Sequence, residues 1–223
     1  MSPTQSNSVD TGLPVSVPGK ADAWLDFIQM CTGLALILFM WCHMILVSSV
    51  IIGPGVMNAL ARFFEATYMA QLGGPLIGLV FLLHFVLAAR KVPFRLEQQQ
   101  TILRHARMLH HGDTWLWVFQ AVSGMAILII GAAHMWVVLS GLPINAFVSA
   151  ARIQHWPWLV FYIFLLFLVE IHLGVGLYRI GVKWGVIKRA NRKQAKRWEL
   201  ILTLCFLTIG VATLIRFVFL DLL

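Results

Sequence analysis

The chain has 223 residues, of which 60% are hydrophobic and 12% are charged, and its formal net charge is +8. A soluble domain of this length would expose far more charge, so the composition excludes that class and indicates a membrane protein. The three cysteines, Cys31, Cys42 and Cys205, form no CxxC or CxxCH motif. The sequence therefore gives no support for a disulfide framework, a zinc knuckle or a covalently attached c-type haem.

A polar segment, residues 1–23, precedes the apolar part of the chain and contains Pro14, Pro18 and several Ser and Thr residues. We predict that it is a flexible or extended cytoplasmic arm and that residues 24–223 form one membrane domain. In chain order, the apolar runs of this domain are residues 27–52, 72–89, 114–139, 156–180 and 200–220. About 20 helical residues cross ~30 Å of hydrocarbon, and at this segment length only helices satisfy their own backbone in lipid. The predicted fold is therefore all-α, an integral membrane bundle of five transmembrane helices.

The positive charge is unevenly divided between the two sides of this predicted bundle. With the N-terminus in the cytoplasm, 14 of the 17 Lys and Arg residues fall on the cytoplasmic side. They are Lys20 and the basic residues of the connections 90–113 and 179–198, which leaves Arg62, Arg152 and Arg216 outside. Cytoplasmic connections carry an excess of Lys and Arg, so we predict the N-terminus inside and the C-terminus outside. The net charge is thus a topology signal, and no nucleic-acid partner is expected.

Four of the eight histidines lie within apolar runs, one in each of the first four: His43, His84, His134 and His172. Ionisable residues in hydrocarbon are costly and usually face the bundle interior, where they carry function. Counted from the inner ends of their runs, His84 and His172 are about 6 and 8 residues deep. His43 and His134 are about 16 and 19 residues deep. At ~1.5 Å per residue, the sequence predicts two levels of two histidines, ~15 Å apart.

Two imidazoles at equal depth on facing helices are suited to the axial ligation of a planar b-type haem, and helix bundles hold such cofactors in their cores. The predicted inner pair is His84 with His172. The predicted outer pair is His43 with His134. Bis-histidine ligation leaves no open iron position, which favours electron transfer over oxygen chemistry. We therefore predict that the first four helices enclose two stacked haems that carry electrons across the membrane.

The other histidines, His105, His110, His111 and His155, are interpreted as surface or interfacial residues. A metal site at His105, His110 and His111 is the alternative, without a cysteine or carboxylate pattern to support it. Gly131 and Gly176 lie close in sequence to haem-ligand candidates and would leave room for a flat macrocycle. Glycine also occurs in membrane helices for packing alone, which is the alternative reading.

Polar residues near the ends of the runs are candidates to contact haem propionates. Gln29 and Lys183 lie toward the inner end, close to the helical face of the histidine in the same run, and Trp117 offers an indole donor there. Arg152 is one of the three outer cations and is the candidate for the outer haem. Ordinary anchoring at the membrane interface is the alternative for all four residues.

Two glutamates complete the candidate site. Glu170 precedes His172 by two residues, so the two side chains point about 200° apart and Glu170 does not share the face that presents His172 to iron. We expect Glu170 to face another helix, a cavity or water, either as a proton relay or as a neutral acid hydrogen-bonded to a neighbouring helix. Glu65, in the outer FFEAT segment, is the candidate to accept protons that quinol oxidation releases. An interfacial glutamate without function is its alternative.

The five apolar runs, their four histidines, the FFEAT segment and the VEIH segment in the fourth run resemble the di-haem cytochrome b anchor of succinate:quinone oxidoreductases. The likeness is closest to the single-subunit anchor of menaquinol:fumarate reductases and covers essentially the whole chain after residue 23. It implies two haems b and a menaquinone on this chain. It also implies a place in the inner membrane of a bacterium that respires fumarate anaerobically.

The resemblance also implies partners and roles. An iron–sulfur subunit would dock on the cytoplasmic side and carry a flavoprotein subunit with covalent FAD, where fumarate is reduced, and the complex would be a dimer of heterotrimers. Glu65 would correspond to a glutamate required for menaquinol oxidation, and Glu170 to one proposed to carry a compensating transmembrane proton flow. The propionate contacts of the family match Gln29, Trp117 and Lys183 for the inner haem and Arg152 for the outer haem. The direction, fumarate reduction or succinate oxidation, stays open.

Two other functions fit part of the pattern. A membrane cytochrome b of another dehydrogenase or reductase, such as a nitrate reductase or a hydrogenase, would keep the haems and change the partner. A proton-coupled transporter or channel would use the buried histidines and acids without haem and would be colourless.

Overall fold

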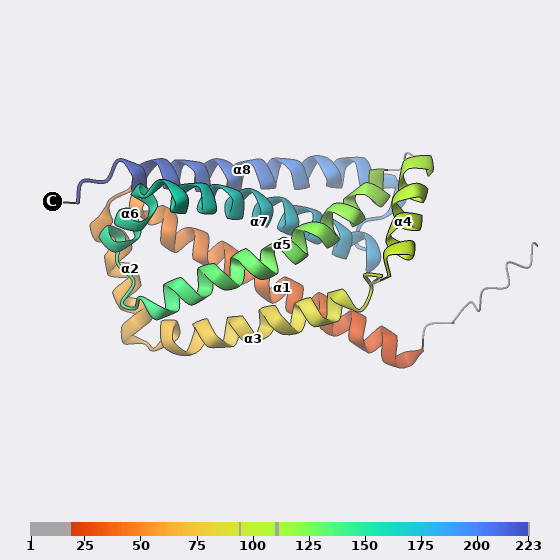
Figure 1. Cartoon of the computed structure of the whole chain (residues 1–223), viewed down its shortest axis with the longest axis horizontal. Coiled ribbons are helices and arrows are strands. Elements are labelled where there is room, and N and C mark those ends of the chain that lie inside the picture. The colour runs from red at the N-terminus through yellow and green to blue at the C-terminus, as the bar shows by residue number, and fades with distance from the viewer. Residues whose placement is uncertain (1–18, 94, 110–111, 223) are drawn as a thin grey trace, which may run out of the picture.

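The computed structural model describes residues 19–93, 95–109 and 112–222, and within these ranges the regular structure is entirely helical (Figure 1). The helices are α1 (Lys20–Ser48), η1 (Ser49–Ile51), α2 (Pro54–Ala66), α3 (Met69–Ala89), α4 (Leu96–Leu109), α5 (Gly112–Ser140), α6 (Ala146–Gln154), α7 (Trp156–Lys183), η2 (Arg189–Asn191) and α8 (Arg192–Val218). Of the predicted N-terminal arm, residues 1–18 lie outside the described residues and residues 20–23 belong to α1. His110 and His111 also lie outside them.

Five helices of the described chain, α1, α3, α5, α7 and α8, are long and apolar enough to cross a membrane. They confirm the predicted all-α fold and its five spans. The largest difference in bounds is in α8, which begins at Arg192, well before the apolar run that starts at residue 200. Its first two turns, RKQAKRWE, are polar but helix-forming, so an apolar count alone misses them.

Three short helices, α2, α4 and α6, are additional to that prediction. A proline at the first helical position starts α2 after Gly53, and Asn145 caps α6 by accepting a hydrogen bond from Phe147 N at 2.8 Å. The charges of Glu97 in the first turn and Arg107 in the last turn of α4 both oppose the helix dipole favourably. These segments are too short or too polar to span a bilayer, so they contain no long apolar run in the sequence.

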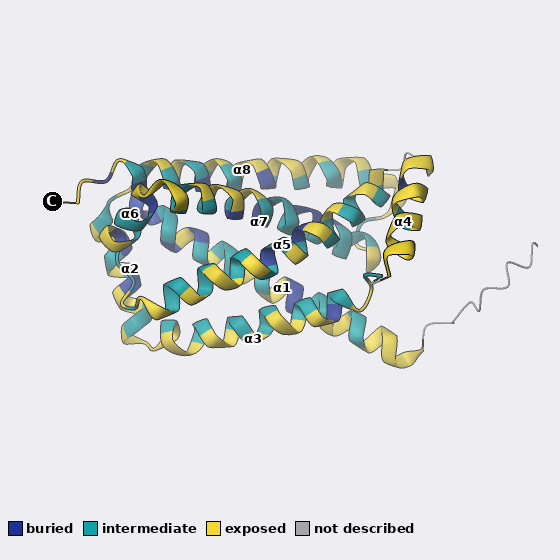
Figure 2. Cartoon of the chain, in the orientation of Figure 1, coloured by how far each residue is buried: buried dark blue, intermediate teal, exposed yellow. Residues whose placement is uncertain are grey.

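The short helices close the two ends of the bundle (Figure 1). Helices α2 and α6 lie at one end together with the C-terminal residues, and α4 lies at the other end. The α2–α6 end holds the larger buried cluster, and Figure 2 shows that buried positions elsewhere are scattered along the long helices. The cluster consists of Val50, Met57, Ala146, Ala150, Ile153, Phe217 and Leu220. This end is therefore a packed cap.

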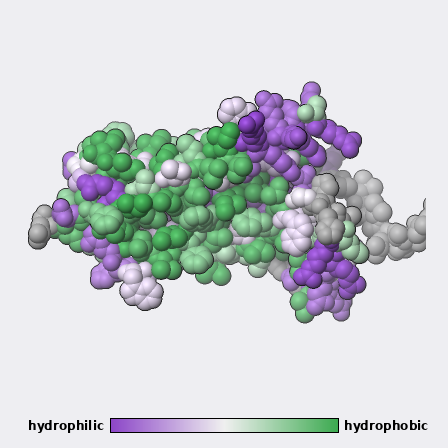
Figure 3. Space-filling view, turned by 90° about the horizontal axis from the view of Figure 1, so that it is seen from above, coloured by the Kyte–Doolittle hydropathy of each residue, from purple (hydrophilic) through white to green (hydrophobic). Residues whose placement is uncertain are grey.

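The face of the bundle seen in Figure 3 is mostly apolar along its middle, and hydrophilic residues gather toward its two ends. Large side chains such as Leu72, Ile129, Trp136 and Phe164 are more than 60% exposed along the long helices. Exposed apolar surface of this extent marks contact with lipid, which agrees with the membrane-protein prediction.

Candidate functional site

At the level nearer the α2–α6 end, called the outer level below, His43 of α1 faces His134 of α5. Their ring centroids are 6.0 Å apart and their planes are inclined by 68°. Aromatic rings surround the pair: Phe39 stacks on His43 at 5.8 Å, and Tyr162 of α7 meets His134 edge-on at 5.4 Å. The structure therefore brings together the two histidines predicted to form the outer pair.

At the inner level, His84 of α3 and His172 of α7 lie close enough to interact electrostatically. His84 Nδ1 is 3.1 Å from the Thr32 hydroxyl of α1, and His172 Nδ1 is 2.9 Å from the Ser123 hydroxyl of α5. Each inner histidine is thus held by a hydroxyl from a neighbouring long helix.

Three helices give the same spacing between the two levels. On α1, Thr32 contacts the inner level and His43 belongs to the outer one, eleven residues later. On α5, Ser123 and His134 are also eleven residues apart, and on α7 Tyr162 at the outer level is ten residues from His172. At ~1.5 Å per residue, spacings of ten and eleven residues correspond to about 15–17 Å, close to the predicted separation.

The hydroxyl contacts favour the tautomer of each inner histidine that carries its proton on Nδ1. The Thr32 hydroxyl donates its single hydrogen to the backbone oxygen of Ile28, 2.9 Å away, and the Ser123 hydroxyl donates to Phe119 O at 2.7 Å. With its hydrogen directed to the backbone, each hydroxyl oxygen can accept a hydrogen bond from histidine Nδ1–H. In this tautomer Nε2 is unprotonated, which is the state an imidazole needs to bind a metal.

The side chain of Gln120 is the third contact of His172. Its amide nitrogen lies 3.2 Å from His172 Nε2 and 3.2 Å from the His172 backbone oxygen. The amide is a donor, so this contact agrees with an unprotonated Nε2. A metal that binds this nitrogen requires the Gln120 amide to rotate away from it.

Two glycines lie directly against the inner rings. A Cβ atom on Gly33 would be 3.0 Å from His84 Cε1, and one on Gly124 would be 3.2 Å from His172 Cε1. Both approaches are tighter than ordinary van der Waals contact, so an alanine would displace the ring. The glycines singled out from the sequence lie elsewhere: Gly131 abuts Ile127 and Phe81, and Gly176 abuts Gln120.

The residues at both levels fit a bis-histidine haem. Metal–imidazole bonds of ~2.0 Å place the ring centroids of two opposite ligands about 6 Å apart, the separation seen for His43 and His134. His134 Nδ1 and the side-chain oxygens of Gln29 and Gln120 are buried without a hydrogen-bond partner among the described residues. A polar cofactor is one way to satisfy such groups. No cluster of three or more His, Cys, Asp or Glu that could hold a metal ion occurs in the described ranges, and a haem requires only two protein ligands.

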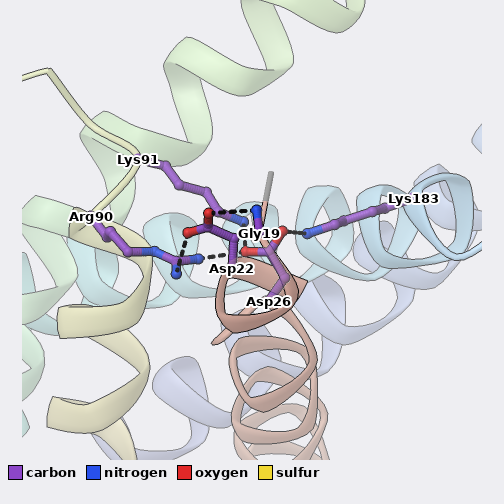
Figure 4. Close-up of polar contacts among 6 residues, drawn as sticks. All are labelled: Gly19, Asp22, Asp26, Arg90, Lys91 and Lys183. Carbon is purple, nitrogen blue, oxygen red and sulfur yellow. Dashed lines mark hydrogen bonds and ion pairs between the residues drawn. The ribbon is translucent and has the colours of Figure 1, made fainter. Parts of the chain in front are cut away.

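Lys183, one of the inner propionate candidates, lies beside Asp26 of α1, which contacts three cations (Figure 4). Its carboxylate lies 2.5 Å from Arg90 Nη2, 2.6 Å from Lys91 Nζ and 2.5 Å from Lys183 Nζ. Partial burial lowers the pKa of the Lys91 ammonium, the hydrogen bond to Asp26 opposes that shift, and the like charge of Lys183 adds to it. Lys183 is therefore held by an acid of the same chain.

The other propionate candidates lie as follows. Gln29 is half-buried on α1, directly before the Thr32 turn, with its side-chain oxygen unpaired. Trp117 is half-buried on α5, one turn before Gln120. Arg152 of α6 lies within electrostatic reach of His134, as expected for a residue of the outer level.

Glu170 lies on the side of α7 opposite the inner histidine contacts. It is 5% exposed and lines a small pocket with Ile37 and Trp41 of α1 and Thr203 of α8. His172, two residues later, instead contacts α5. The Glu170 side chain therefore points away from the face of His172 and toward α1 and α8, the orientation that the sequence predicts.

Glu65 lies near the C-terminal end of α2, where its carboxylate accepts a hydrogen bond from Ile144 N at 2.6 Å. Asn58, seven residues earlier on the same helix face, accepts one from Ala146 N at 2.7 Å. These bonds tie α2 to the connection between α5 and α6. The second carboxylate oxygen of Glu65 remains available, and Phe63 beside it is 57% exposed.

The residues that contact the inner histidines were not predicted from the sequence; they are Thr32, Gly33, Gln120, Ser123 and Gly124. One signal was available, because Thr32 precedes His43 by eleven residues and Ser123 precedes His134 by eleven. Eleven residues are close to three full helical turns, so each hydroxyl lies on the face of an outer histidine, one level lower.

Comparison with known proteins places the chain in a family. Residues 97–211, which include His134, Glu170 and His172, match the model described as succinate dehydrogenase/fumarate reductase transmembrane subunit. The chain belongs to this family. Among similar curated proteins, the fumarate reductase cytochrome b subunit of Helicobacter pylori is 36% identical over 200 residues, which are 86% of this chain and 78% of that protein.

The subunit of the same description from Wolinella succinogenes is 36% identical over 197 residues, 81% of this chain and 75% of that protein. The chain is therefore a transmembrane subunit of the succinate dehydrogenase and fumarate reductase family, related over most of its length to cytochrome b subunits.

Proposed function

We propose that this chain is the electron-transfer anchor of a quinol:fumarate reductase, and that it holds two haems b between paired histidines. His84 and His172 would hold the inner haem, and His43 and His134 the outer haem. When bound, a b-type haem supplies an iron centre that accepts and releases one electron, and bis-histidine ligation reserves it for electron transfer. The observation that carries the proposal is the pairing of the four intramembrane histidines at two levels, with a hydroxyl group beside Nδ1 of each inner histidine.

The outer level is the proposed place of menaquinol oxidation, with Glu65 as the proton acceptor. Quinol oxidation releases two protons with its two electrons, so a base must lie beside the electron acceptor. The Ile144 N–H fixes one carboxylate oxygen of Glu65. The other oxygen is free to accept a proton from a quinol hydroxyl.

The inner end is the proposed docking side for an iron–sulfur subunit and its flavoprotein, on which fumarate would be reduced or succinate oxidised. This end carries α4, the basic start of α8 and the Asp26 cluster of Arg90, Lys91 and Lys183. Gln29, Trp117 and Lys183 would contact the inner haem propionates and Arg152 the outer ones. The family and the two relatives described above support these partners.

The excess of Lys and Arg at the α4 end supports an inner-membrane topology with the N-terminus in the cytoplasm and the C-terminus outside. An electron that moves from the outer quinol to the cytoplasm works against the membrane potential, at ~2.3 kcal/mol per 100 mV. We propose that Glu170 carries protons inward to offset this cost. The assembled complex is proposed to be a dimer of heterotrimers.

The experiment that tests the proposal uses Glu65→Gln in the purified complex. The amide oxygen still accepts the Ile144 N–H, so folding and both haems should be retained, and dithionite should reduce them normally. Haem reduction by menaquinol should fall by about 10²–10⁴-fold, because the position no longer accepts a proton. Glu97→Gln, at an exposed position of α4, is the matched control and should behave as the wild type.

Normal menaquinol-dependent reduction in Glu65→Gln would contradict the quinol-site assignment. Covalent flavin in the purified complex supports the fumarate reductase reading, whereas molybdenum or nickel would assign the chain to another cytochrome b complex. A colourless protein would support a proton-coupled transporter.

A further inference from the structure

We propose that Thr203 and Glu199 of α8 form the cytoplasmic half of the proton path that begins at Glu170. This inference rests on the proposed proton-carrying role of Glu170 and names the groups that would take the proton onward. Both residues lie against Gly174, which is one helical turn beyond Glu170 toward the α4 end of the bundle.

The first step of the path is the pocket beside Glu170. Glu170 and Thr203 line it together, and its remaining walls are apolar side chains of α1, α7 and α8. The centre of a water molecule can occupy a volume of about 10 Å³ in this pocket, which is enough for one water molecule. The hydrogen bonds found among the described residues do not include the Glu170 carboxylate, so one water molecule in this pocket would link it to Thr203.

The second step is the hydrogen bond from the Thr203 hydroxyl to Glu199 Oε1, at 3.5 Å. Thr203 is buried and Glu199 is half-buried. The two residues are four apart on α8, so the bond advances the path by about 6 Å toward the α4 end. Beyond Glu199, Lys196 pairs with Asp113 at 2.7 Å, which places Glu199 next to the charged surface of that end.

Gly174 keeps this passage open. A Cβ atom there would collide with the Thr203 hydroxyl oxygen and would lie 2.7 Å from Glu199 Oε1. Gly174 is one helical turn after Glu170 on α7, so it lies on the same face as the acid. The absence of a side chain at this position lets two polar groups of α8 reach the helix that carries Glu170.

The proton moves in balanced steps. The Glu170 carboxyl gives a proton to the pocket water, the water gives one to the Thr203 oxygen, and the Thr203 hydroxyl proton passes to the Glu199 carboxylate. Glu199 then releases it to water at the cytoplasmic surface, and Glu170 regains a proton from the outer side. One proton moves inward for each electron, and every group returns to its starting state.

The test uses the whole complex in sealed proteoliposomes, with menaquinol in the bilayer, fumarate outside and a potential-sensitive dye. The wild type should turn over without generating a membrane potential. Glu170→Gln, Glu199→Gln and Thr203→Val should retain both haems but generate a potential, and a protonophore should both abolish it and raise turnover by about twofold or more. Thr208→Val is the matched control, because its exposed hydroxyl bonds only within α8.

The outcomes separate the two proposals. A potential in Glu170→Gln but not in Glu199→Gln or Thr203→Val would overturn this inference and leave the role of Glu170 intact. A potential in the wild type, or in none of the variants, would overturn the proton-carrying role of Glu170 as well. Thr203→Val removes one hydroxyl and leaves the shape of the side chain nearly unchanged. If Glu199→Gln fails to assemble, the potential measured with Thr203→Val tests the proposed path by itself.

Discussion

The inner and outer histidine levels are built differently. At the inner level, hydroxyl groups hold both imidazoles through Nδ1, and glycines lie against both rings. At the outer level, aromatic rings flank the imidazoles, and His134 Nδ1 is buried without a partner among the described residues. Hydrogen bonds therefore hold the inner pair in position, whereas the outer pair relies on packing.

The depth of each level accounts for the difference. The outer level lies next to the cap formed by α2 and α6, which supplies buried apolar surface and the charge of Arg152. The inner level lies nearer the α4 end, and hydrogen bonds from α1 and α5 hold its histidines. A ligand held by hydrogen bonds responds to the loss of one hydroxyl, and a ligand held by packing responds to changes in volume.

The largest expected effect comes from removing one ligand at each level. His84→Ala should lose the inner haem and His43→Ala the outer haem, which leaves one haem in each variant. In His84→Ala the remaining haem should still be reduced by menaquinol, because Glu65 and the outer pair are intact. In His43→Ala it should be reduced by dithionite only. Haem quantification with stopped-flow spectroscopy measures both, and menaquinol reduction of the haem left in His43→Ala would reverse the order of the levels.

The hydroxyl groups should matter next. Thr32→Val removes the group that accepts His84 Nδ1–H, so affinity for the inner haem should fall by about 10–100-fold and its midpoint potential should rise, because the imidazole becomes less basic. Thr32→Ser keeps the hydroxyl and should restore both values. Haem transfer to an acceptor protein and redox titration are the measurements. Equal effects of the valine and serine variants would show that shape, and not the hydrogen bond, matters at this position.

Glycine substitutions should produce the smallest differences between the levels. Gly33→Ala places a methyl group 3.0 Å from the His84 ring and should cost about 1–3 kcal/mol of stability as well as part of the inner haem. Gly131→Ala meets only ordinary contacts, 3.4 Å from Ile127, and should be tolerated. Thermal unfolding followed at the haem absorbance compares the two variants. Equal destabilisation would remove the distinction between a ring-supporting and a packing glycine.

The sequence predicts the features of this molecule that depend on single helices and on their depth in the membrane. Five spans, the two histidine levels and the outward turn of Glu170 from His172 follow from helical rise and angle alone. Thr32, Ser123 and Gly174 were not predicted, because their roles depend on which helix lies beside which, and a run of apolar residues does not encode its neighbour. The ion pair of Asp26 with Lys183 was not predicted for the same reason, because the two residues are 157 positions apart in the chain.

The number of haems that the chain holds tests the proposed haem sites at the two histidine levels most directly. We would measure the dithionite-reduced minus oxidised spectrum of the purified complex, with haem quantified per copy of this chain. Two haems b per chain is the predicted result. One haem would mean that either the hydroxyl-supported or the aromatic-flanked pair is not a haem site, and none would contradict the proposed electron transfer altogether.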